Sequence, residues 1–219
     1  MQPLYLKDWR GWLPGDLGSA VPTERQIDER PGSSLPAMLR RRLDETGRAV
    51  CDLLAALDPE ARCPLIHASR HGDTRYTLSM LEELTAGNSL SPTRFSMSVH
   101  NAVIGVHSIA RQHHRPLQAL GACGQEFDAL MTEAAGYLAE GHDDVVAVFS
   151  EGPLPEAYAG HTTHPGHPCA VVLRLSRSEG ERLIAEANGA SDAPTPEDVI
   201  DWLAGRRSSL AQRWRREAL

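Results

Sequence analysis

Cys123 is the residue with the clearest chemical potential in this sequence. It follows a short apolar segment, Leu117–Ala122, and precedes a run with helical periodicity that continues to Gly141. A cysteine at such a strand-to-helix elbow suits nucleophilic attack, because small neighbours admit a substrate and the start of a helix favours the thiolate. A small buried residue at a tight turn explains the same pattern without chemistry. The residues alone leave both interpretations open.

A base for Cys123 would have to come from the ten histidines of the chain, which are densest in the segment HTTHPGHP. His161, His164 and His167 in this segment could place three imidazoles around one metal ion. The usual zinc signatures, however, use a helical HExxH motif or paired cysteines, and the two prolines favour an extended loop. We expect a solvated loop without a metal, and we keep a metal-binding protein as an alternative.

Composition and missing motifs exclude several other classes of protein. The 219 residues are 41% hydrophobic and 23% charged, as in a globular domain, and the net charge of -7 disfavours nucleic acid and anionic membranes as partners. The sequence has no phosphate-binding GxGxxG or GxxxxGK[ST] motif, so we expect no cofactor. It also has no signal peptide and no apolar run of ~20 residues, so we expect a cytoplasmic protein without a membrane span.

The hydrophobic pattern predicts an α/β fold in which strands and helices alternate. Thr195 is a good N-cap for the last helix, with proline and two acids in the first turn. The expected strands cover residues 4–13, 64–69, 117–122, 145–149 and 170–175. The expected helices cover residues 36–57, 77–86, 99–110, 127–138 and 177–187, and a last helix runs from residue 195 toward the C-terminus.

The expected last helix is basic, although the chain as a whole is acidic. Its positive charges suit the C-terminal end of a helix dipole, where solvated arginines are common. They could also attract an acidic partner. The residues are Arg206, Arg207, Arg213, Arg215 and Arg216.

Four segments of the sequence resemble one family. They are SRHGD (69–73), SPTRFSMSVHNAVIG (91–105), the elbow with its helix (117–141) and EGPLPEAY (151–158). Together they are similar to the ketosynthase-like β-ketoacyl synthase chain-length factors of type II polyketide systems, notably those that make aryl polyene and xanthomonadin-type pigments. The resemblance spans about residues 36–175. It implies a thiolase-like half-fold, the N-terminal half of a ketosynthase, with helices packed on a mixed sheet.

The resemblance also implies a domain plan and a non-catalytic role. We expect a β-ketoacyl synthase N-terminal-like domain over residues 1–176 and a C-terminal helical extension over residues 177–219. Full ketosynthases carry an acylated cysteine at this elbow and two histidines in their C-terminal half, and the sequence has no segment that resembles those histidine motifs. Counted back from Gly141, the ketosynthase spacing arrives at Gly124 instead of Cys123.

The implied function is that of a subunit in a heterodimer. A full-length ketosynthase would be the partner, an acyl carrier protein would bind transiently, and this chain would shape the acyl channel. A free-standing acyltransferase or condensing enzyme that uses Cys123 is the alternative.

The resemblance further implies where the partners bind. In the thiolase fold, the strand before the elbow pairs with its counterpart across the dimer. We therefore expect a partner interface at Leu117, Gln118, Leu120, Gly121 and Ala122, with Ser98, His100 and Asn101 near it, and a carrier-protein contact at Arg213, Arg215 and Arg216.

Overall fold

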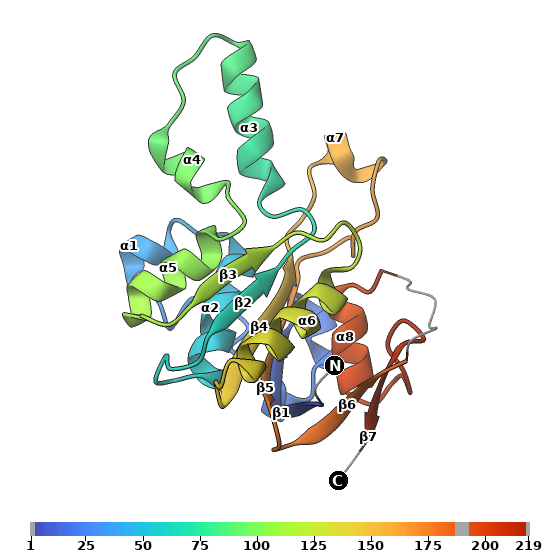
Figure 1. The fold of residues 1–219 in the computed structure, drawn as a ribbon. Coiled ribbons are helices and arrows are strands. Elements are labelled where there is room, and N and C mark those ends of the chain that lie inside the picture. Colours follow the sequence, from blue (N-terminus) through green and yellow to red (C-terminus); the bar gives the residue numbers. More distant parts are fainter. Residues whose placement is uncertain (1–2, 187–192, 218–219) are drawn as a thin grey trace.

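A computed structural model describes residues 3–186 and 193–217. Within these residues the chain builds one seven-stranded mixed sheet in the order β3-β2-β4-β5-β1-β6-β7 (Figure 1). This is the predicted α/β class with a mixed sheet. The strands are β1 (Leu4–Trp12), β2 (Leu65–Ala68), β3 (Leu117–Leu120), β4 (Asp144–Glu151), β5 (Cys169–Ser176), β6 (Glu181–Ala185) and β7 (Trp214–Glu217).

The sheet has a parallel half and an antiparallel half. β2 runs parallel to both β3 and β4, so that His67 lies opposite Ala119 on one side and Val148 on the other. β4, β5, β1, β6 and β7 pair antiparallel. The carboxyl ends of β2, β3 and β4 therefore meet at one edge of the sheet.

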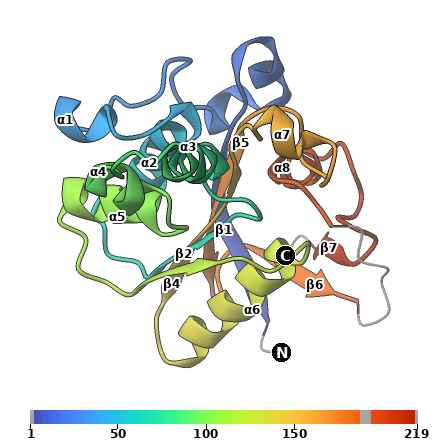
Figure 2. The ribbon, with the colours of Figure 1, turned by 90° about the horizontal axis from the view of Figure 1, so that it is seen from above.

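Helices cover both faces of the sheet (Figure 2). On one face α2 (Glu45–Leu57) and α5 (Ala102–Arg111) pack against Val146 and Val148 of β4. On the other face α6 (Glu126–Ala139) and α8 (Pro196–Leu203) pack against Val145 and Ala147. Side chains of a strand alternate between the two faces. Because both faces are covered, the middle of β4, residues 145–149, is a continuous apolar run.

Two helices project away from the sheet. They are α3 (Thr74–Thr85) and α4 (Pro92–Met97), and we call this hairpin, residues 74–97, the arm (Figure 1). The short helices are α1 (Ala37–Arg40), α7 (Glu156–Ala159) and the 3-10 turns Gly15–Ala20 and Thr23–Arg25. No helix within residues 3–186 and 193–217 combines the length and the apolar character needed to cross a bilayer.

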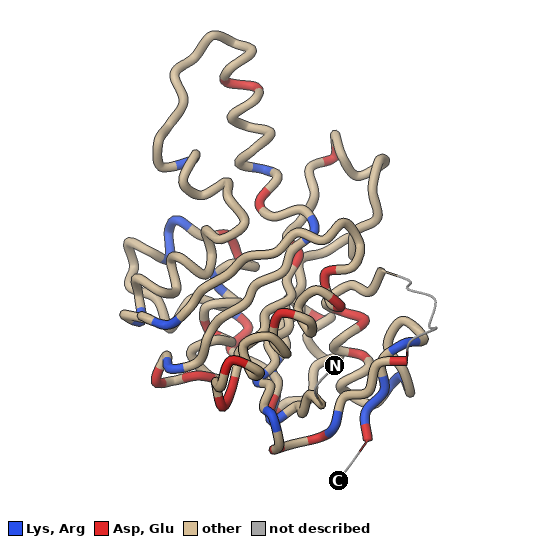
Figure 3. Tube along the Cα trace, in the orientation of Figure 1, with Lys and Arg blue, Asp and Glu red and all other residues tan. Residues whose placement is uncertain are grey.

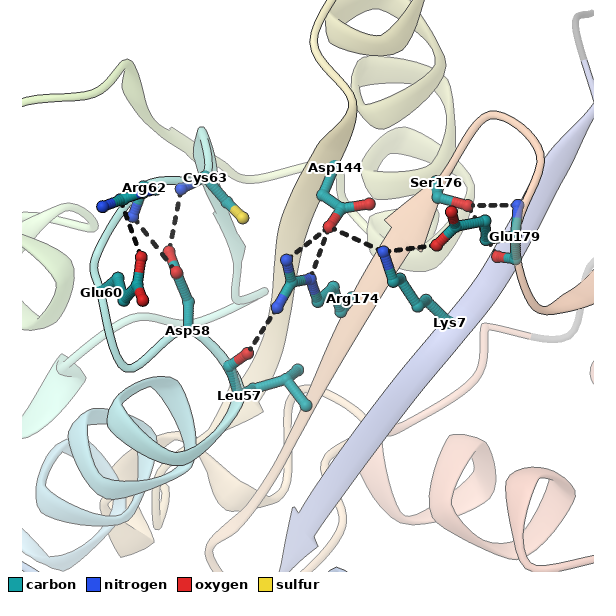
Figure 4. A network of polar contacts seen from close by, with 10 residues as sticks. All are labelled: Lys7, Leu57, Asp58, Glu60, Arg62, Cys63, Asp144, Arg174, Ser176 and Glu179. Carbon is teal, nitrogen blue, oxygen red and sulfur yellow. Dashed lines mark hydrogen bonds and ion pairs between the residues drawn. The ribbon is translucent and has the colours of Figure 1, made fainter.

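A polar network ties the sheet together at the end opposite the carboxyl ends of the parallel strands (Figure 4). Asp144, the first residue of β4, accepts hydrogen bonds from Arg174 Nε of β5 at 2.7 Å and from Lys7 Nζ of β1 at 3.4 Å. Arg174 Nη1 also donates to the carbonyl of Leu57 at the end of α2 at 3.3 Å. One carboxylate thus links three neighbouring strands and the helix that covers them.

The helix predicted over residues 36–57 is divided into α1 and α2. Asp44 causes the division, because its carboxylate accepts the main-chain N–H of Gly47 at 2.7 Å and so caps the start of α2. The arm also contains an element that the sequence reasoning missed. Ser91 is the N-cap and Pro92 the first residue of α4, a helix between the two expected over residues 77–86 and 99–110.

The helix predicted over residues 177–187 is wrong, because Glu181–Ala185 forms β6, which pairs with β1; Ala187 lies outside the described residues. Gly180 makes the turn into β6 with φ +111°. A Cβ at this position would lie 2.2 Å from the carbonyl oxygen of Leu6, so the close approach of the two strands requires glycine. Periodicity cannot separate helix from strand in so short an apolar segment.

The last helix begins as predicted and ends much earlier. Thr195 and Asp198 form a capping box at the start of α8. α8 ends at Leu203, and Gly205 follows with φ +79°, a conformation that terminates helices. The residues after it lead into β7, so the described residues 177–186 and 193–217 contain one helix and two strands in place of the expected helical extension. The strands β6 and β7 complete the same sheet.

Candidate functional site

The carboxyl ends of β2, β3 and β4 bring the segments singled out in the sequence to one place. Residues 69–73 follow β2, and residues 121–125, which we call the elbow, follow β3. Glu151, the first residue of EGPLPEAY, ends β4. Ligand sites of parallel sheets form at this edge. This edge is therefore the candidate functional site.

Arg70 and Glu126 form an ion pair beside the elbow. The side chain of Glu126, the first residue of α6, is 0% exposed, and its Oε2 lies 3.0 Å from Arg70 Nη2. Its Oε1 accepts the main-chain N–H of Gly124 at 2.8 Å. Burial alone would raise the pKa of Glu126, but the hydrogen bonds from Gly124 and Arg70 outweigh it and lower the pKa. The N–H of Gly124 is therefore bound to an ionised carboxylate.

The carboxyl group of Glu151 is also buried and also contacts Arg70. It accepts the main-chain N–H of Arg70 at 2.5 Å and the hydroxyl of Ser69 at 3.3 Å. Burial raises the pKa of Glu151 to about 7, although the hydrogen bonds from the main chain of Arg70 and the next residue act against this shift. The loop after β2 is thus fastened to the end of β4 by a group that titrates near neutral pH.

His100 connects the segment before α5 to the elbow. A Cβ added to Gly121 would lie 3.4 Å from His100 Nε2, and one added to Gly72 would lie 3.3 Å from Cε1, so the ring packs against both glycines. Ser98, by contrast, donates its hydroxyl to the carbonyl of Phe95 at 2.9 Å, and Asn101 is exposed at the start of α5. Of the three residues predicted near the interface, His100 is the one that contacts the elbow.

Cys123 is an exposed thiol in the elbow. Its φ of +51° is rare for a residue other than glycine and resembles the strained turn of a nucleophile elbow. All four cysteines lie within the described residues and are free thiols. Cys51, Cys63 and Cys169 are buried, and burial raises the pKa of each of these thiols. Cys123 is therefore the thiol that a reagent reaches first.

The histidine-rich loop lies against the loop after β2. Arg70 Nη1 donates to the hydroxyl of Thr163 at 3.1 Å, and His71 Nε2 lies 3.3 Å from the carbonyl of Thr163. Arg70 thus contacts both this loop and the elbow.

The histidines of this loop make local contacts. His164 Nδ1 accepts the N–H of Gly166 at 3.0 Å, and His167 Nε2 lies 3.3 Å from a carboxylate oxygen of Glu197. Across residues 3–186 and 193–217, the structure contains no group of three or more His, Cys, Asp or Glu residues that could hold a metal ion. The alternative of a metal site at His161, His164 and His167 finds no support in this geometry.

β3 is an edge strand, and among the described strands it pairs with β2 alone. Leu117 and Ala119 pack on the side of α2 and α5. Leu120 packs on the side of α6, where the hydroxyl of Tyr137 donates to Gln118 Oε1 at 3.3 Å. Gln118 and Leu120 therefore share one face of β3, and this face is turned toward the chain's own helix α6. The backbone edge of β3 that points away from β2 is unpaired among the described strands.

The opposite edge strand, β7, differs in charge. β3 contains no charged residue, whereas β7 contains Arg215, Arg216 and Glu217, and Figure 3 shows basic and acidic segments close together around it. Charges on an edge strand oppose pairing with another chain. Each arginine predicted to contact a carrier protein lies on or next to β7 and already has an acidic neighbour. The pairs are Arg213–Asp128 at 3.4 Å, Arg215–Glu186 at 3.1 Å and Arg216–Glu181 at 3.2 Å.

Large apolar side chains are exposed on the arm and around α5. Phe95 of α4 is 61% exposed and Ile109 of α5 is 66% exposed. Leu81 and Leu84 of α3 and Val99, which follows α4, are exposed as well. Clusters of exposed apolar side chains mark interaction surfaces.

The sequence reasoning missed the group formed by Arg70, Glu126 and Glu151. Each residue was inside a quoted segment, and an acid in the first turn of a helix is a usable signal. Their meeting depends on the parallel alignment of β2 and β4 and on the position of α6, which no local pattern contains.

Comparisons with known proteins agree with this architecture. The family model described as "Beta-ketoacyl synthase, N-terminal domain" matches residues 9–217. No curated protein matches the chain.

Solved structures share the fold. A chain from the structure of the ketosynthase (ApeO) in complex with its chain length factor (ApeC) from Xenorhabdus doucetiae has a TM-score of 0.80 at 24% identity, and the match covers 100% of both chains. A β-ketoacyl synthase from Burkholderia phymatum STM815 has a TM-score of 0.56 at 12% identity, with 95% of this chain and 71% of that chain covered. The ishigamide ketosynthase/chain length factor has a TM-score of 0.56 at 11% identity, with 94% and 72% covered. The fold is therefore the thiolase-like fold of ketosynthases.

Proposed function

Because the chain belongs to the β-ketoacyl synthase N-terminal domain family, we propose that it is a non-catalytic subunit that pairs with a full-length ketosynthase, as a chain length factor does. The observations that carry this proposal are the unpaired, uncharged edge of β3 and the exposed apolar side chains of the arm and α5, such as Phe95 and Ile109. An edge without charges is a template for another strand. The solved complex of a ketosynthase with its chain length factor supports the same kind of pairing.

The backbone of β3 supports the addition of a second strand. The carbonyls of Pro116 and Leu120 accept hydrogen bonds from β2, at 3.0 Å from Leu65 N and at 3.3 Å from Ser69 N. Groups that point to β2 alternate along the strand with groups that point away. The N–H and C=O of Leu117 and Ala119 are therefore directed to the open edge. A strand of the partner would bind these groups.

The elbow supports a non-catalytic role. Acyl transfer requires N–H donors that stabilise a developing oxyanion. The N–H of Gly124, the position to which the ketosynthase spacing leads, donates to Glu126 at 2.8 Å instead. A buried carboxylate at this point repels a second negative charge. In our proposal the partner therefore supplies the reactive cysteine and both histidines.

One observation favours the alternative, a free-standing acyltransferase that uses Cys123. This thiol is exposed and has the left-handed backbone of a nucleophile elbow. Incubation of the isolated chain with an acyl thioester, followed by intact mass measurement, separates the two functions. The non-catalytic proposal predicts that Cys123 is not acylated stoichiometrically. The alternative predicts one acyl group per chain and its loss in Cys123→Ala.

The wider role of the complex follows from the resemblance of the sequence. The partner condenses malonyl units delivered by an acyl carrier protein in the cytoplasm, and this chain completes the acyl channel and limits product length. Aryl polyene or related pigments are the proposed products. Arg213, Arg215 and Arg216 are the proposed contact for the carrier protein.

Co-expression with a tagged ketosynthase encoded next to this chain tests the proposal. We expect one-to-one co-purification, a heterodimer by size exclusion with light scattering, and condensation activity only when both chains are present. If the chain elutes alone and the ketosynthase gives the same products without it, the proposal is wrong.

A further inference from the structure

The short helix α1 carries exposed apolar and basic side chains at the outer edge of the molecule. Figures 1 and 2 both show α1 on the side away from β6 and β7. Met38 is 76% exposed, the largest fraction among the exposed large apolar side chains of the described residues. Arg40, Arg41 and Arg42 follow it and are exposed as well. We call residues 36–42 the basic tip.

The arginines of the basic tip differ from those around β7, because they have no acidic partner. Within residues 3–186 and 193–217 none of the three forms an ion pair. Asp44, the nearest acid along the chain, lies 2.6 Å from Arg75 and accepts the N–H of Gly47. Glu45 is the exposed acid that remains to weaken the positive charge. Guanidinium groups without a carboxylate are free to bind phosphate oxygens.

The core of the protein holds the basic tip in place. Leu39 packs against the buried cluster that joins α2, α4 and α5. The loop before the tip is fixed by Asp52, whose buried carboxylate accepts the N–H of Gly32 at 2.5 Å and of Ser34 at 2.9 Å. A Cβ added to Gly32 would lie 2.7 Å from Cδ of Arg40, so this arginine packs on the loop. The exposed side chains therefore stand on an ordered support, and binding costs little further ordering.

We propose that the basic tip docks this protein on an anionic lipid surface. Arg40, Arg41 and Arg42 bind the phosphate groups of the lipids, and Met38 enters the boundary between headgroups and acyl chains. A polybasic segment and an apolar insertion are each weak signals, and together they give reversible membrane binding. The net charge of -7 opposes this contact. Screening, however, limits the opposition to acids within about 8 Å of the lipid at physiological ionic strength.

Two features favour a lipid surface over an acidic protein. The basic tip is one short protruding segment, whereas a specific protein interface uses about 20–30 residues on each side. Its most exposed side chain, Met38, is apolar, and a lipid surface has an apolar layer directly beneath its charged groups. The inference goes beyond the proposed function and does not depend on it, since no ketosynthase takes part in the contact.

Flotation of the purified full chain with lipid vesicles tests the inference. We expect binding to vesicles of equal parts phosphatidylcholine and phosphatidylglycerol, at least about tenfold weaker binding to phosphatidylcholine alone, and release at high salt. Arg41→Gln combined with Arg42→Gln removes two exposed charges and should weaken binding about thirtyfold, which corresponds to about 2 kcal/mol. Met38→Gln should weaken binding about fivefold, because it removes the apolar insertion.

The matched control changes the net charge by the same amount at another place. Arg177→Gln combined with Arg182→Gln removes two half-exposed arginines that pair with Asp143 and Glu217. Its vesicle binding should stay within about twofold of the unmodified chain, because these arginines lie outside the basic tip. An equal loss in both double variants would mean that only the overall charge matters, which overturns the inference.

Two further results would overturn it. One is that the unmodified chain does not float with the anionic vesicles. The other is that the variant with Arg41→Gln and Arg42→Gln binds vesicles normally but binds an acidic acyl carrier protein about thirtyfold more weakly, measured by fluorescence anisotropy. The basic tip would then be a protein contact. Because the substituted side chains are exposed, Tm should stay within a few degrees, and a loss of vesicle binding then reports on the contact itself.

Discussion

The main-chain N–H of Gly124 donates a hydrogen bond to the carboxylate of Glu126 at 2.8 Å, one residue after Cys123. Arg70 holds this carboxylate from the other side, at 3.0 Å. A nucleophile elbow needs free donors at the point where an oxyanion develops, and here the donor is already bound to a negative group. The elbow thus has the backbone conformation of a catalytic turn, but its hydrogen bonds are typical of a structural role.

The first prediction concerns Cys123→Ala in the heterodimer. Because Cys123 is not expected to carry the acyl chain, product formation should stay within about threefold of the unmodified complex, whereas loss of a nucleophile costs orders of magnitude. The rate of product formation by the complex is the measurement. Substitution of the partner's reactive cysteine is the control and should abolish products. If the Cys123→Ala complex assembles and loses activity by orders of magnitude, Cys123 takes part in the reaction and the non-catalytic proposal is wrong.

The second prediction is a pH dependence of stability that originates at Glu151. Burial raises its pKa from 4.5 to about 7 in the folded chain. Between these two values the folded state binds a proton that the unfolded state releases, so the free energy of unfolding falls as pH rises from about 4.5 to 7. Below and above this pH range, Glu151 causes no change of the free energy of unfolding with pH. The shift corresponds to at most about 3 kcal/mol.

Urea unfolding at pH 5 and pH 8 measures this dependence. Glu151→Gln keeps the size of the side chain and cannot ionise, so it should flatten the profile and be more stable than the unmodified chain at pH 8. Glu140→Gln, at an exposed position, should leave the profile unchanged. An equally steep profile in Glu151→Gln would show that another group is responsible.

The third prediction concerns Arg215, whose side chain is 62% exposed and lies 3.1 Å from Glu186. A surface pair of this kind contributes little to stability, so Arg215→Glu should fold normally. If the carrier protein contacts β7, the substitution raises the KM for carrier protein at low salt, and the difference shrinks as salt screens the charges. Arg177→Glu, at another exposed ion pair, is the control. An unchanged KM at low salt would mean that these arginines only balance nearby acids and protect the edge of the sheet.

Local signals in the sequence explain where the fold could be predicted. Thr195 was predicted as the cap of α8 and forms the capping box. The end of α8 also had a local signal, because Gly205 terminates it with φ +79°. The division of the first predicted helix depends on Asp44, which is a good N-cap by type. Each of these helix ends therefore has a signal in the local sequence.

Other features depend on residues far apart in the chain. The turn at Gly180 is set by the carbonyl of Leu6, and the contacts of Arg70 with Glu126 and Glu151 cross three elements. The face on which Leu120 packs also depends on residues far away in the chain. It packs against the core beside α6, so a charge at this position would damage the chain's own packing and could not report on a partner alone.

The affinity of the ketosynthase for the Ala119→Pro variant of this chain tests the central claim most directly. The N–H of Ala119 is directed to the open edge of β3, proline removes it, and edge strands tolerate proline. The chain should therefore fold with Tm within a few degrees of the unmodified chain. Its Kd for the ketosynthase should rise about a hundredfold, which corresponds to about 3 kcal/mol. Ala119→Ser keeps the N–H and should stay within about threefold. If Ala119→Pro binds the ketosynthase with an unchanged Kd, β3 is not the strand that pairs with the partner.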